Sequence, residues 1–348
     1  MANIAEKEQL LCYLREKGIF EQEDTLTIKY FSGGVSGVAA FVTNGKRDIL
    51  IKQALSVLKV KDNWECDPGR IIIEHKALEV YAELVPECVP FPLFSDEENM
   101  IIGREAAPLG CVMWKEQLLN GRLDFKTAEM AIDALCKVHN LSAVSPLIRE
   151  KFQNNIIFSE LRVDPYIKRV VEKHPDLKSR SEQIISRLMN EKVALIHGDY
   201  SPKNILVADD RIYILDFEVA HFGHPSFDIA FLFNHFMLKA VKHKEWSEAY
   251  LNMMLYMSDR YFANVNCINS EKLEQQSTEL LAFLMLARVD GKSPVEYLTQ
   301  EEDKETVRKA AYGILNEGAE SFGKAADILQ NILREKISLH KENSYGKL

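Results

Sequence analysis

Along residues 4–53, the spacing of hydrophobic positions changes from helical to strand-like. Residues 4–17 place leucines at helical intervals and are followed by Gly18, a residue suited to end a helix. Three short apolar runs with strand character come next, at residues 25–31, 38–43 and 48–53. The dipeptide Asn44-Gly45 between the last two is typical of a hairpin turn. The pattern predicts a helix followed by the beginning of an antiparallel sheet.

A second helix is predicted over residues 70–84, because apolar residues recur there at helical spacing and several prolines follow. Two further apolar runs, at 91–94 and 100–103, complete a five-stranded sheet with one helix against it. The stretch Pro108-Leu109-Gly110 marks the end of this part of the chain. We therefore expect one lobe of mixed helix and strand and a separate lobe after it.

The second lobe is predicted to be mostly helical. Its expected helices lie near residues 112–120, 126–141, 180–190, 226–242, 246–264, 271–289 and 302–336. Short apolar runs at 193–196, 205–207 and 212–215 interrupt this pattern, and Asp209-Asp210 joins the last two. The fold is therefore predicted to be α+β, with a small β insertion in a helical lobe.

Composition narrows the function classes. The 348 residues are 47% hydrophobic and 27% charged, which is typical of a globular protein. Lys and Arg total 43 against 52 for Asp and Glu, so the formal charge of −9 disfavours nucleic acid and membrane surfaces as partners. Six scattered cysteines without a C-x-x-C pair indicate reduced core thiols and no zinc site. Without a signal-like or membrane-spanning run, we expect a cytoplasmic protein.

Polar residues concentrate in the β insertion. The segment His197-Gly198-Asp199 follows one predicted strand, Asn204 comes five residues after Asp199, and Asp216 follows the hairpin. Two carboxylates and an amide are therefore expected to converge at strand ends. Mg²⁺ prefers oxygen ligands of these kinds, and such a metal leaves coordination positions for phosphate and water.

The pattern H-x-D-x-x-x-x-N, followed by a hairpin and D-F-E, resembles the catalytic loop and metal-binding segment of the aminoglycoside phosphotransferase/choline kinase family. These enzymes are small-molecule relatives of protein kinases, and the similarity spans roughly residues 25–240. The N-terminal lobe is most similar to methylthioribose kinases, through the stretch from Lys52 to Trp64 and the R-x-x-x-E-x-x-x-L pattern of 70–78. Two positions depart from those enzymes: Asn204 replaces a serine, and Arg288 stands where they carry paired arginines.

The resemblance implies a protein-kinase-like fold of two lobes. Residues 1–107 would form the N-terminal nucleotide-binding lobe, and residues 108–348 the C-terminal helical lobe with the catalytic loop and the acceptor site. The implied cofactors are ATP and Mg²⁺, and the implied reaction transfers the γ-phosphate to a hydroxyl group. Asp199 would be the catalytic residue, and Asn204 and Asp216 the metal ligands. A carboxylate is a weak base toward an alcohol, so Asp199 is expected to orient the hydroxyl and accept its proton late.

The same resemblance implies the groups that bind the nucleotide. Lys52 would contact the α- and β-phosphates, and a glutamate on the following helix would hold it, either Glu74 or Glu79. Backbone N–H groups of the glycine-rich turn would approach the phosphates, at Gly33, Gly34 and Ser36. Adenine would lie against the connection 103–107, with Glu105 and Ala107 as the binding positions.

Neighbouring polar residues have structural or undecided roles. His139 and His197 are interpreted as structural residues that bond backbone groups, and Asp228 as a buried brace that accepts backbone N–H groups of the catalytic loop. Glu218 is either a second metal neighbour or part of a salt bridge. Lys203 either touches the γ-phosphate or faces water.

The expected partner is a small-molecule hydroxyl acceptor, with no nucleic acid and no membrane. A sugar or a thiosugar such as methylthioribose is the first candidate; the alternatives are an aminoglycoside and an amino-alcohol similar to choline. A pseudokinase that binds nucleotide without transfer, and nucleotidyl transfer to a protein, are hypotheses from other classes. The resemblance to methylthioribose kinases, which form dimers, makes a homodimer one option for the assembly.

Overall fold

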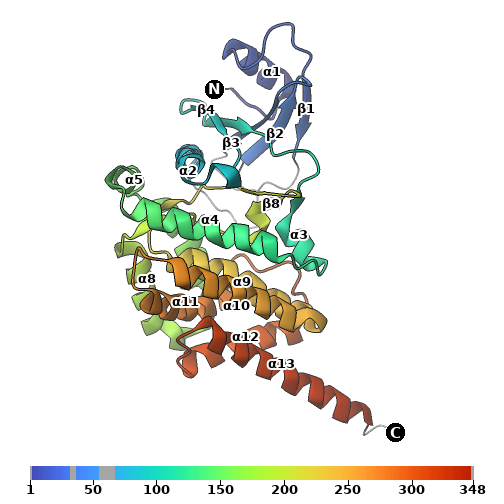
Figure 1. The fold of residues 1–348 in the computed structure, drawn as a ribbon, viewed down its shortest axis with the longest axis vertical. Helices are drawn as coiled ribbons and strands as arrows, with labels where there is room; N and C mark the ends of the chain where they lie inside the picture. Colours follow the sequence, from blue (N-terminus) through green and yellow to red (C-terminus); the bar gives the residue numbers. More distant parts are fainter. Residues whose placement is uncertain (1, 32–36, 55–66, 346–348) are drawn as a thin grey trace.

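The computed structural model describes residues 2–31, 37–54 and 67–345, with a sheet-containing part at one end and a larger helical part below it (Figure 1). A five-stranded antiparallel sheet forms the first part, in the strand order β1-β2-β3-β5-β4. Its strands are β1 (Thr27–Tyr30), β2 (Gly37–Thr43), β3 (Asp48–Ala54), β4 (Pro92–Asp96) and β5 (Ile101–Glu105). The predicted five-stranded sheet and the α+β class are confirmed.

Two helices cover opposite faces of this sheet, whereas the sequence predicted only one helix packed against it. Helix α1 (Lys7–Glu16) contributes Leu10 and Leu14 to an apolar cluster with Ile49 and Ile51 of β3. Side chains alternate along a strand, so Lys52 points to the other face. Helix α2 (Arg70–Leu84) lies on that second face. The alternation of β3 therefore directs the Lys52 side chain toward α2.

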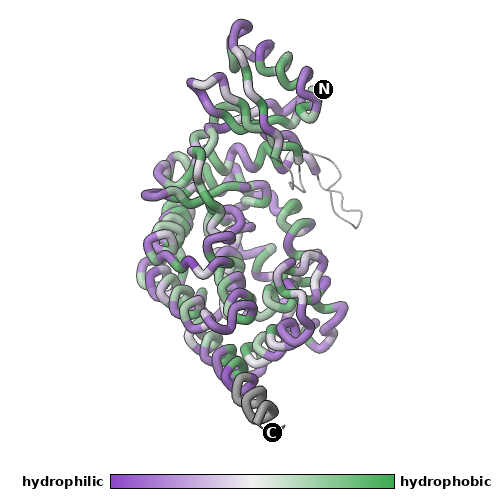
Figure 2. Tube along the Cα trace, turned by 90° about the vertical axis from the view of Figure 1, so that its right-hand side faces the viewer, coloured by the Kyte–Doolittle hydropathy of each residue, from purple (hydrophilic) through white to green (hydrophobic). Residues whose placement is uncertain are grey.

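The helical part is built around one fully enclosed helix, α9 (Ser226–Lys242), whose residues 226–241 are all buried. A helix that is apolar on nearly every side is stable only inside a core. Figure 2 shows hydrophobic segments toward the middle of the molecule and polar segments at many outer turns. The other helices are α3 (Trp114–Leu119), α4 (Phe125–Ala143), α5 (Pro146–Lys151), α6 (Ile156–Phe158), α7 (Arg169–Lys173), α8 (Lys178–Asn190), α10 (Ser247–Asn264), α11 (Ser270–Asp290), α12 (Glu301–Asn316) and α13 (Phe322–Tyr345).

The prediction of a single helix over 302–336 is wrong. The chain forms α12 and α13 with a break between them, and Gly318 in that break has a φ of 60°. This left-handed conformation is common where a helix ends, and glycine adopts it without steric cost. The apolar spacing had placed Gly318 on a continuous helical face. Between α6 and α7 a π-helical segment, η2 (Ser159–Lys168), was not predicted.

The β insertion forms two small sheets. The predicted hairpin is confirmed as β8 (Ile205–Val207) and β9 (Ile212–Ile214), and β6 (Val112–Met113) pairs with β8. In contrast, β7 (Ala194–Ile196) pairs with β10 (His221–Gly223), a strand that the sequence did not indicate. Short 3₁₀ turns lie at η1 (Pro86–Cys88), η3 (Pro175–Leu177), η4 (Pro202–Asn204) and η5 (Lys244–Trp246).

The lobe boundary between residues 107 and 108 stays a prediction; β5 ends at Glu105 and β6 begins at Val112. The five cysteines that the structure describes are free thiols. Cys88 and Cys136 are buried as expected, whereas Cys12 is exposed, so the interpretation as core thiols is wrong for Cys12. Across the described ranges, none of the helices has the length and apolar character needed to cross a membrane.

Candidate active site

Three strand ends bring the predicted polar residues together. The segment His197–Asp199 follows β7, Asn204 ends the η4 turn, and Asp216 follows β9. Gly198 has a φ of 75°, and a Cβ built on it would lie 2.8 Å from the carbonyl oxygen of Val219. The bend that turns the chain from β7 into the catalytic loop therefore requires glycine.

Asp228, near the start of α9, holds this loop from beneath. Its carboxylate accepts the backbone N–H groups of His197 at 2.7 Å and of Gly198 at 2.8 Å. The predicted role of Asp228 as a buried brace is confirmed. His139 lies 3.3 Å from the same carboxylate and 2.7 Å from the hydroxyl of Tyr261, so it bonds side chains and not the expected backbone groups.

His197 has a structural role, as expected. Its Nε2 lies 3.0 Å from the carbonyl of Leu215, and its Nδ1 accepts the backbone N–H of Asp199 at 3.1 Å. Burial lowers the pKa of His197, which keeps the ring neutral. The ring therefore connects the catalytic loop to the end of β9 and fixes both segments.

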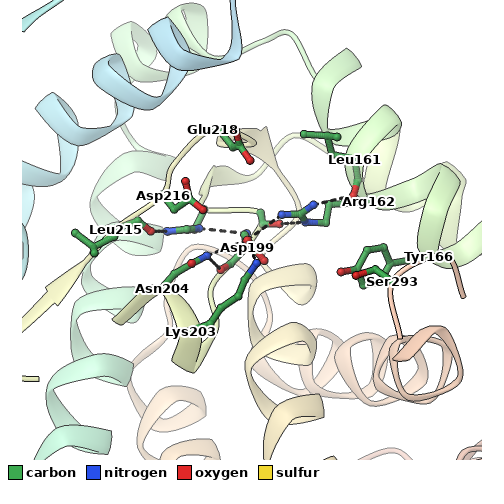
Figure 3. A network of polar contacts seen from close by, with 12 residues as sticks. Leu161, Arg162, Tyr166, Asp199, Lys203, Asn204, Leu215, Asp216, Glu218 and Ser293 are labelled. Carbon is green, nitrogen blue, oxygen red and sulfur yellow. Dashed lines mark hydrogen bonds and ion pairs between the residues drawn. The ribbon is translucent and has the colours of Figure 1, made fainter. Parts of the chain in front are cut away.

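The Asp199 carboxylate has two oxygens in different surroundings. Figure 3 shows Arg162, Lys203 and Asn204 pointing at it from three directions. All three bind the same atom, Oδ2: Asn204 Nδ2 at 2.9 Å, Arg162 Nη2 at 3.0 Å and Lys203 Nζ at 2.9 Å. The other oxygen, Oδ1, is buried and has no hydrogen-bond partner among the residues that the structure describes. Buried polar atoms are normally paired, so Oδ1 is an acceptor held ready for a donor that comes from outside the chain.

Asn204 and Asp216 present oxygens of the kind that Mg²⁺ prefers. The amide nitrogen of Asn204 donates to the carbonyl oxygen of Asp199 at 3.0 Å and to its Oδ2, which leaves the amide oxygen for another contact. Asp216 has a φ of 70°, which is rare for a residue with a side chain. Strained backbone of this kind is often found at functional sites, where it aims a side chain that a relaxed backbone would direct elsewhere.

Lys52 connects the sheet to this loop. Its ammonium lies 2.7 Å from both carboxylate oxygens of Glu74 and 2.9 Å from Oδ1 of Asp216. Of the two glutamates considered as partners of Lys52, Glu74 and not Glu79 therefore contacts it. Glu79 instead lies 3.0 Å from the ammonium of Lys151.

Neighbouring cations keep the Asp199 and Asp216 carboxylates ionised. Burial alone would raise the pKa values of Asp199 and Asp216, but neighbouring cations reverse this and hold both below their usual range. For Asp199 the cations are Arg162 and Lys203, and for Asp216 they are Lys52 and Lys203. Both carboxylates are therefore ionised at neutral pH.

Glu218 is part of a salt bridge, one of the two roles considered for it. Its carboxylate lies 3.1 Å from Nε of Arg70, whose side chain is fully buried at the start of α2. Burial, followed by the negative charge of Asp216, raises the pKa of Glu218 to about 7. This bridge is a second charged connection between α2 and the segment after β9.

Sequence reasoning missed Arg162 and left Lys203 undecided. Arg162 lies on η2, has a buried side chain and also donates to the carbonyl oxygen of Gly198 at 2.8 Å. No motif marks it, because it lies 37 positions before Asp199 in a segment with no predicted structure. For Lys203, the ammonium pairs with Asp199 and the side chain is 46% exposed, and its contact with a γ-phosphate stays a prediction.

The residues present fit a divalent cation shared with a phosphate-bearing ligand. Within the described ranges, no group of three or more His, Cys, Asp or Glu side chains is arranged to hold a metal by itself. Asn204 and Asp216 would therefore supply part of a coordination shell, and phosphate and water the rest. Gly33, Gly34 and Ser36, the expected phosphate-binding positions, lie outside the described residues.

The expected adenine-binding positions lie at the end of β5. The backbone N–H of Glu105 donates to Phe91 at 2.8 Å, and its carbonyl oxygen accepts from Nη1 of Arg104 at 3.0 Å. The backbone groups of Ala107 bond no other described residue. Of Glu105 and Ala107, it is therefore Ala107 whose backbone N–H and carbonyl groups are both available to a ligand.

Comparison with known proteins gives one family. Residues 27–261 match the model of the phosphotransferase enzyme family. The chain is 25% identical over 372 residues to methylthioribose kinase of Bacillus cereus (strain AH187), which covers 91% of this chain and 92% of that protein.

Solved structures share the fold at low sequence identity. Choline kinase from Cryptosporidium parvum Iowa II superposes with a TM-score of 0.52 at 13% identity, covering 97% of both chains. An amicoumacin kinase in complex with AMP-PNP and Ca²⁺ superposes with a TM-score of 0.56 at 11% identity, covering 90% of this chain and 96% of that one. The predicted protein-kinase-like fold is confirmed by these similarities.

Proposed function

The chain belongs to the phosphotransferase enzyme family, and from this premise we propose that it is an ATP- and Mg²⁺-dependent small-molecule kinase. It transfers the γ-phosphate to a hydroxyl group of a small metabolite, and a sugar or a thiosugar such as methylthioribose is the favoured acceptor. The observation that carries the proposal is Oδ1 of Asp199, a buried carboxylate oxygen without a partner beside the amide of Asn204. A substrate hydroxyl is a donor that suits it.

On the nucleotide side, residues 1–107 form the binding lobe in this proposal. Lys52 contacts the α- and β-phosphates, and Glu74 keeps its ammonium in place. Asn204 and Asp216 hold Mg²⁺, which when bound neutralises charge on the phosphate oxygens. The AMP-PNP and Ca²⁺ bound to the amicoumacin kinase support a nucleotide with a divalent cation here.

On the acceptor side, Asp199 orients the hydroxyl through Oδ1 while Arg162, Lys203 and Asn204 hold Oδ2. The lowered pKa of Asp199 makes it a weak base, so its main contribution is position. The proton of the hydroxyl passes to Oδ1 late, as the bond to phosphorus forms.

The sugar or thiosugar acceptor is supported by the methylthioribose kinases, which match this chain over nine-tenths of its length. Aminoglycosides and amino-alcohols are the alternative acceptors of the same reaction. A pseudokinase is disfavoured because a complete set of charged and amide groups for transfer is present.

The test is an Asp199→Asn variant, assayed with ATP and Mg²⁺ against sugars, methylthioribose, amino-alcohols and nucleosides. We expect kcat to fall by about 10³-fold or more, with ATP affinity within about threefold of wild type. Asp164→Asn is the matched control, because its carboxylate is half exposed and pairs only with nearby Lys168. Wild-type turnover in Asp199→Asn would remove the proposed role. Nucleotide binding without a phosphorylated product from any acceptor would instead identify a pseudokinase.

A further inference from the structure

Two basic residues, Arg288 and Lys239, are connected to the candidate active site through aromatic rings; Arg288 is partly buried and Lys239 is fully buried. Arg288 of α11 donates through Nη1 to the hydroxyl of Tyr166 at 3.1 Å and to Ser293 at 2.5 Å (carbonyl) and 3.1 Å (Oγ). In Figure 3, Tyr166 and Ser293 lie beside each other to the right of Asp199. The ring of Tyr166 also lies 5.9 Å from the guanidinium of Arg162, which pairs with Asp199. Arg288 is therefore connected to the candidate active site through one aromatic ring.

The second cation is Lys239 of α9, which has no exposed surface. Its ammonium has one long contact, 3.4 Å to the carbonyl oxygen of His235, and lies 5.4 Å from the centre of the Tyr297 ring. His235 leads back to the site, because its ring lies 5.5 Å from that of Phe231, which packs against Tyr166. We call Arg288, His235 and Lys239 the acceptor-side cluster.

Several polar atoms of this cluster and its border have no partner. Nε2 of His235, Nε of Arg288 and the hydroxyl of Tyr297 are buried, and each lacks a hydrogen bond to the described part of the chain. His235 is only 7% exposed. Unpaired buried polar atoms are uncommon in a folded chain, and several in one place are consistent with a site for a ligand that supplies partners.

The charges of the cluster are also unmatched. Asp199 is already paired with Arg162 and Lys203, and Glu296 is paired with Lys115. Arg288 donates to neutral oxygens only, and Lys239 pairs with no carboxylate among the described residues. Burial, followed by the charge of Lys115, lowers the pKa of Lys239 to about 7. Glu296 is the nearby acid and is already paired with Lys115, so within the described ranges Lys239 is a buried ammonium without a carboxylate in contact. That is unfavourable, and an anionic ligand would complete the site.

We propose that the hydroxyl acceptor carries an anionic oxygen group, a carboxylate or a phosphate monoester, that binds between Arg288 and Lys239 while its hydroxyl meets Asp199. The inference rests on the proposed kinase function and narrows its substrate class. A cationic acceptor would meet like charges in this cluster, which disfavours aminoglycosides and choline. Methylthioribose itself is neutral, so the inference favours an anionic sugar or thiosugar over it. An anionic group on the acceptor would also stabilise the buried ammonium of Lys239.

The experiment compares acceptors that share a skeleton and differ in charge: ribose with ribonate and ribose 5-phosphate, and glucose with gluconate, glucose 6-phosphate and glucosamine. We expect an anionic member of a set to have the highest kcat/KM, and the two anion types separate carboxylate from phosphate recognition. For that acceptor, Lys239→Met should raise KM about 10- to 100-fold, as expected for one lost charge-assisted hydrogen bond. Its kcat and its KM for ATP should stay within about threefold of wild type.

Lys242→Met is the matched control, because it makes the same change on the same helix at a partly exposed position. Lys239→Met should be at least as stable as wild type without acceptor, because it removes a buried charge. A less stable Lys239→Met protein would give Lys239 a structural role and overturn the inference. An unchanged KM would overturn it as well.

The inference and the proposed function fail differently. If a neutral or cationic acceptor has the higher kcat/KM, the kinase function stands and the anionic acceptor is wrong. If ATP binds but no compound of the panel or of a metabolite extract gains a phosphate, the kinase function itself is wrong, and the inference falls with it.

Discussion

Replacing Arg162 by methionine tests whether the candidate active site depends on a residue that no motif marks. The variant removes the guanidinium 3.0 Å from Oδ2 of Asp199 and its hydrogen bonds to the carbonyl oxygens of Gly198 and Leu161. Methionine keeps much of the apolar volume of the side chain. The loss is therefore mainly one of charge and of hydrogen bonds.

The magnitude follows from burial. Removing one partner of a buried ion pair costs about 3–5 kcal/mol. Lys203 remains 2.9 Å from Asp199, and its side chain is 46% exposed, so the carboxylate keeps one partly hydrated cation. We therefore expect the free energy of unfolding to fall by about 3 kcal/mol, the lower end of that range. Arg162 is the first of the two cations that lower the pKa of Asp199, so its loss should raise the pKa of this buried carboxyl.

The sign of the pH effect is fixed by the direction of the pKa shift. In the wild type the pKa of Asp199 is lowered, so activity that needs the carboxylate is present at neutral pH and is lost as pH falls through that pKa. In Arg162→Met the loss should begin at a higher pH than in the wild type. The measurements are the pH profile of kcat/KM and urea unfolding.

Arg169→Met is the matched control for this variant, since its guanidinium is about half exposed and pairs with Glu172. In an Asp199→Asn background, Arg162→Met should cost at least about 1 kcal/mol less, because the uncompensated charge is absent. Arg162→Met with the acid limb and stability of the wild type would refute the reasoning.

Three further predictions use the same assays. Lys52→Met should lower the free energy of unfolding by about 3–5 kcal/mol, because two carboxylates lose their shared cation, and lower kcat about 10²- to 10³-fold in steady-state assays. Lys203→Met should lower kcat about 10- to 100-fold with little change in KM for ATP. Lys239 has a lowered pKa of about 7, so its unfavourable charge is present below that pH and relieved above it. Stability of the wild type relative to Lys239→Met should thus improve by about 2 kcal/mol from about pH 7 to pH 9 in urea unfolding, and a pH-independent difference would contradict this. The charged groups around Lys239 are Lys115, His235, Arg288 and Glu296.

The residues that sequence reasoning brought together are those whose spacing is set by local structure. A short turn separates Asp199 from Asn204, and one hairpin separates Asn204 from Asp216, so their convergence follows from strand geometry. Lys52 and Glu74 are 22 residues apart, yet they meet because the face of β3 that carries Lys52 is the face that α2 covers. Their catalytic and metal-binding roles stay predictions.

The contacts that sequence reasoning missed depend on packing between distant segments. Arg162 reaches Asp199 from a π-helical turn, and Lys239 reaches Tyr297 from a helix that is almost entirely buried. Neither position has a periodic or local signal, because a buried cation in a helical pattern looks like a surface residue until its neighbours are known. Gly318 shows the reverse case, since its place on an apolar face hid the end of a helix.

The charges at the two ends of the site are unbalanced in opposite directions: the nucleotide end has too few cations, and the acceptor end has too few anions. At the nucleotide end, one ammonium, that of Lys52, contacts the carboxylates of Glu74 and Asp216. The raised pKa of Glu218, caused by burial and then by Asp216, reflects the same crowding of acids, which a divalent cation relieves. At the acceptor end, Arg288 and Lys239 are cations held by neutral groups. Among the described residues, the nucleotide end therefore lacks a cation, which Mg²⁺ would bring, and the acceptor end lacks an anion, which the proposed acceptor would bring.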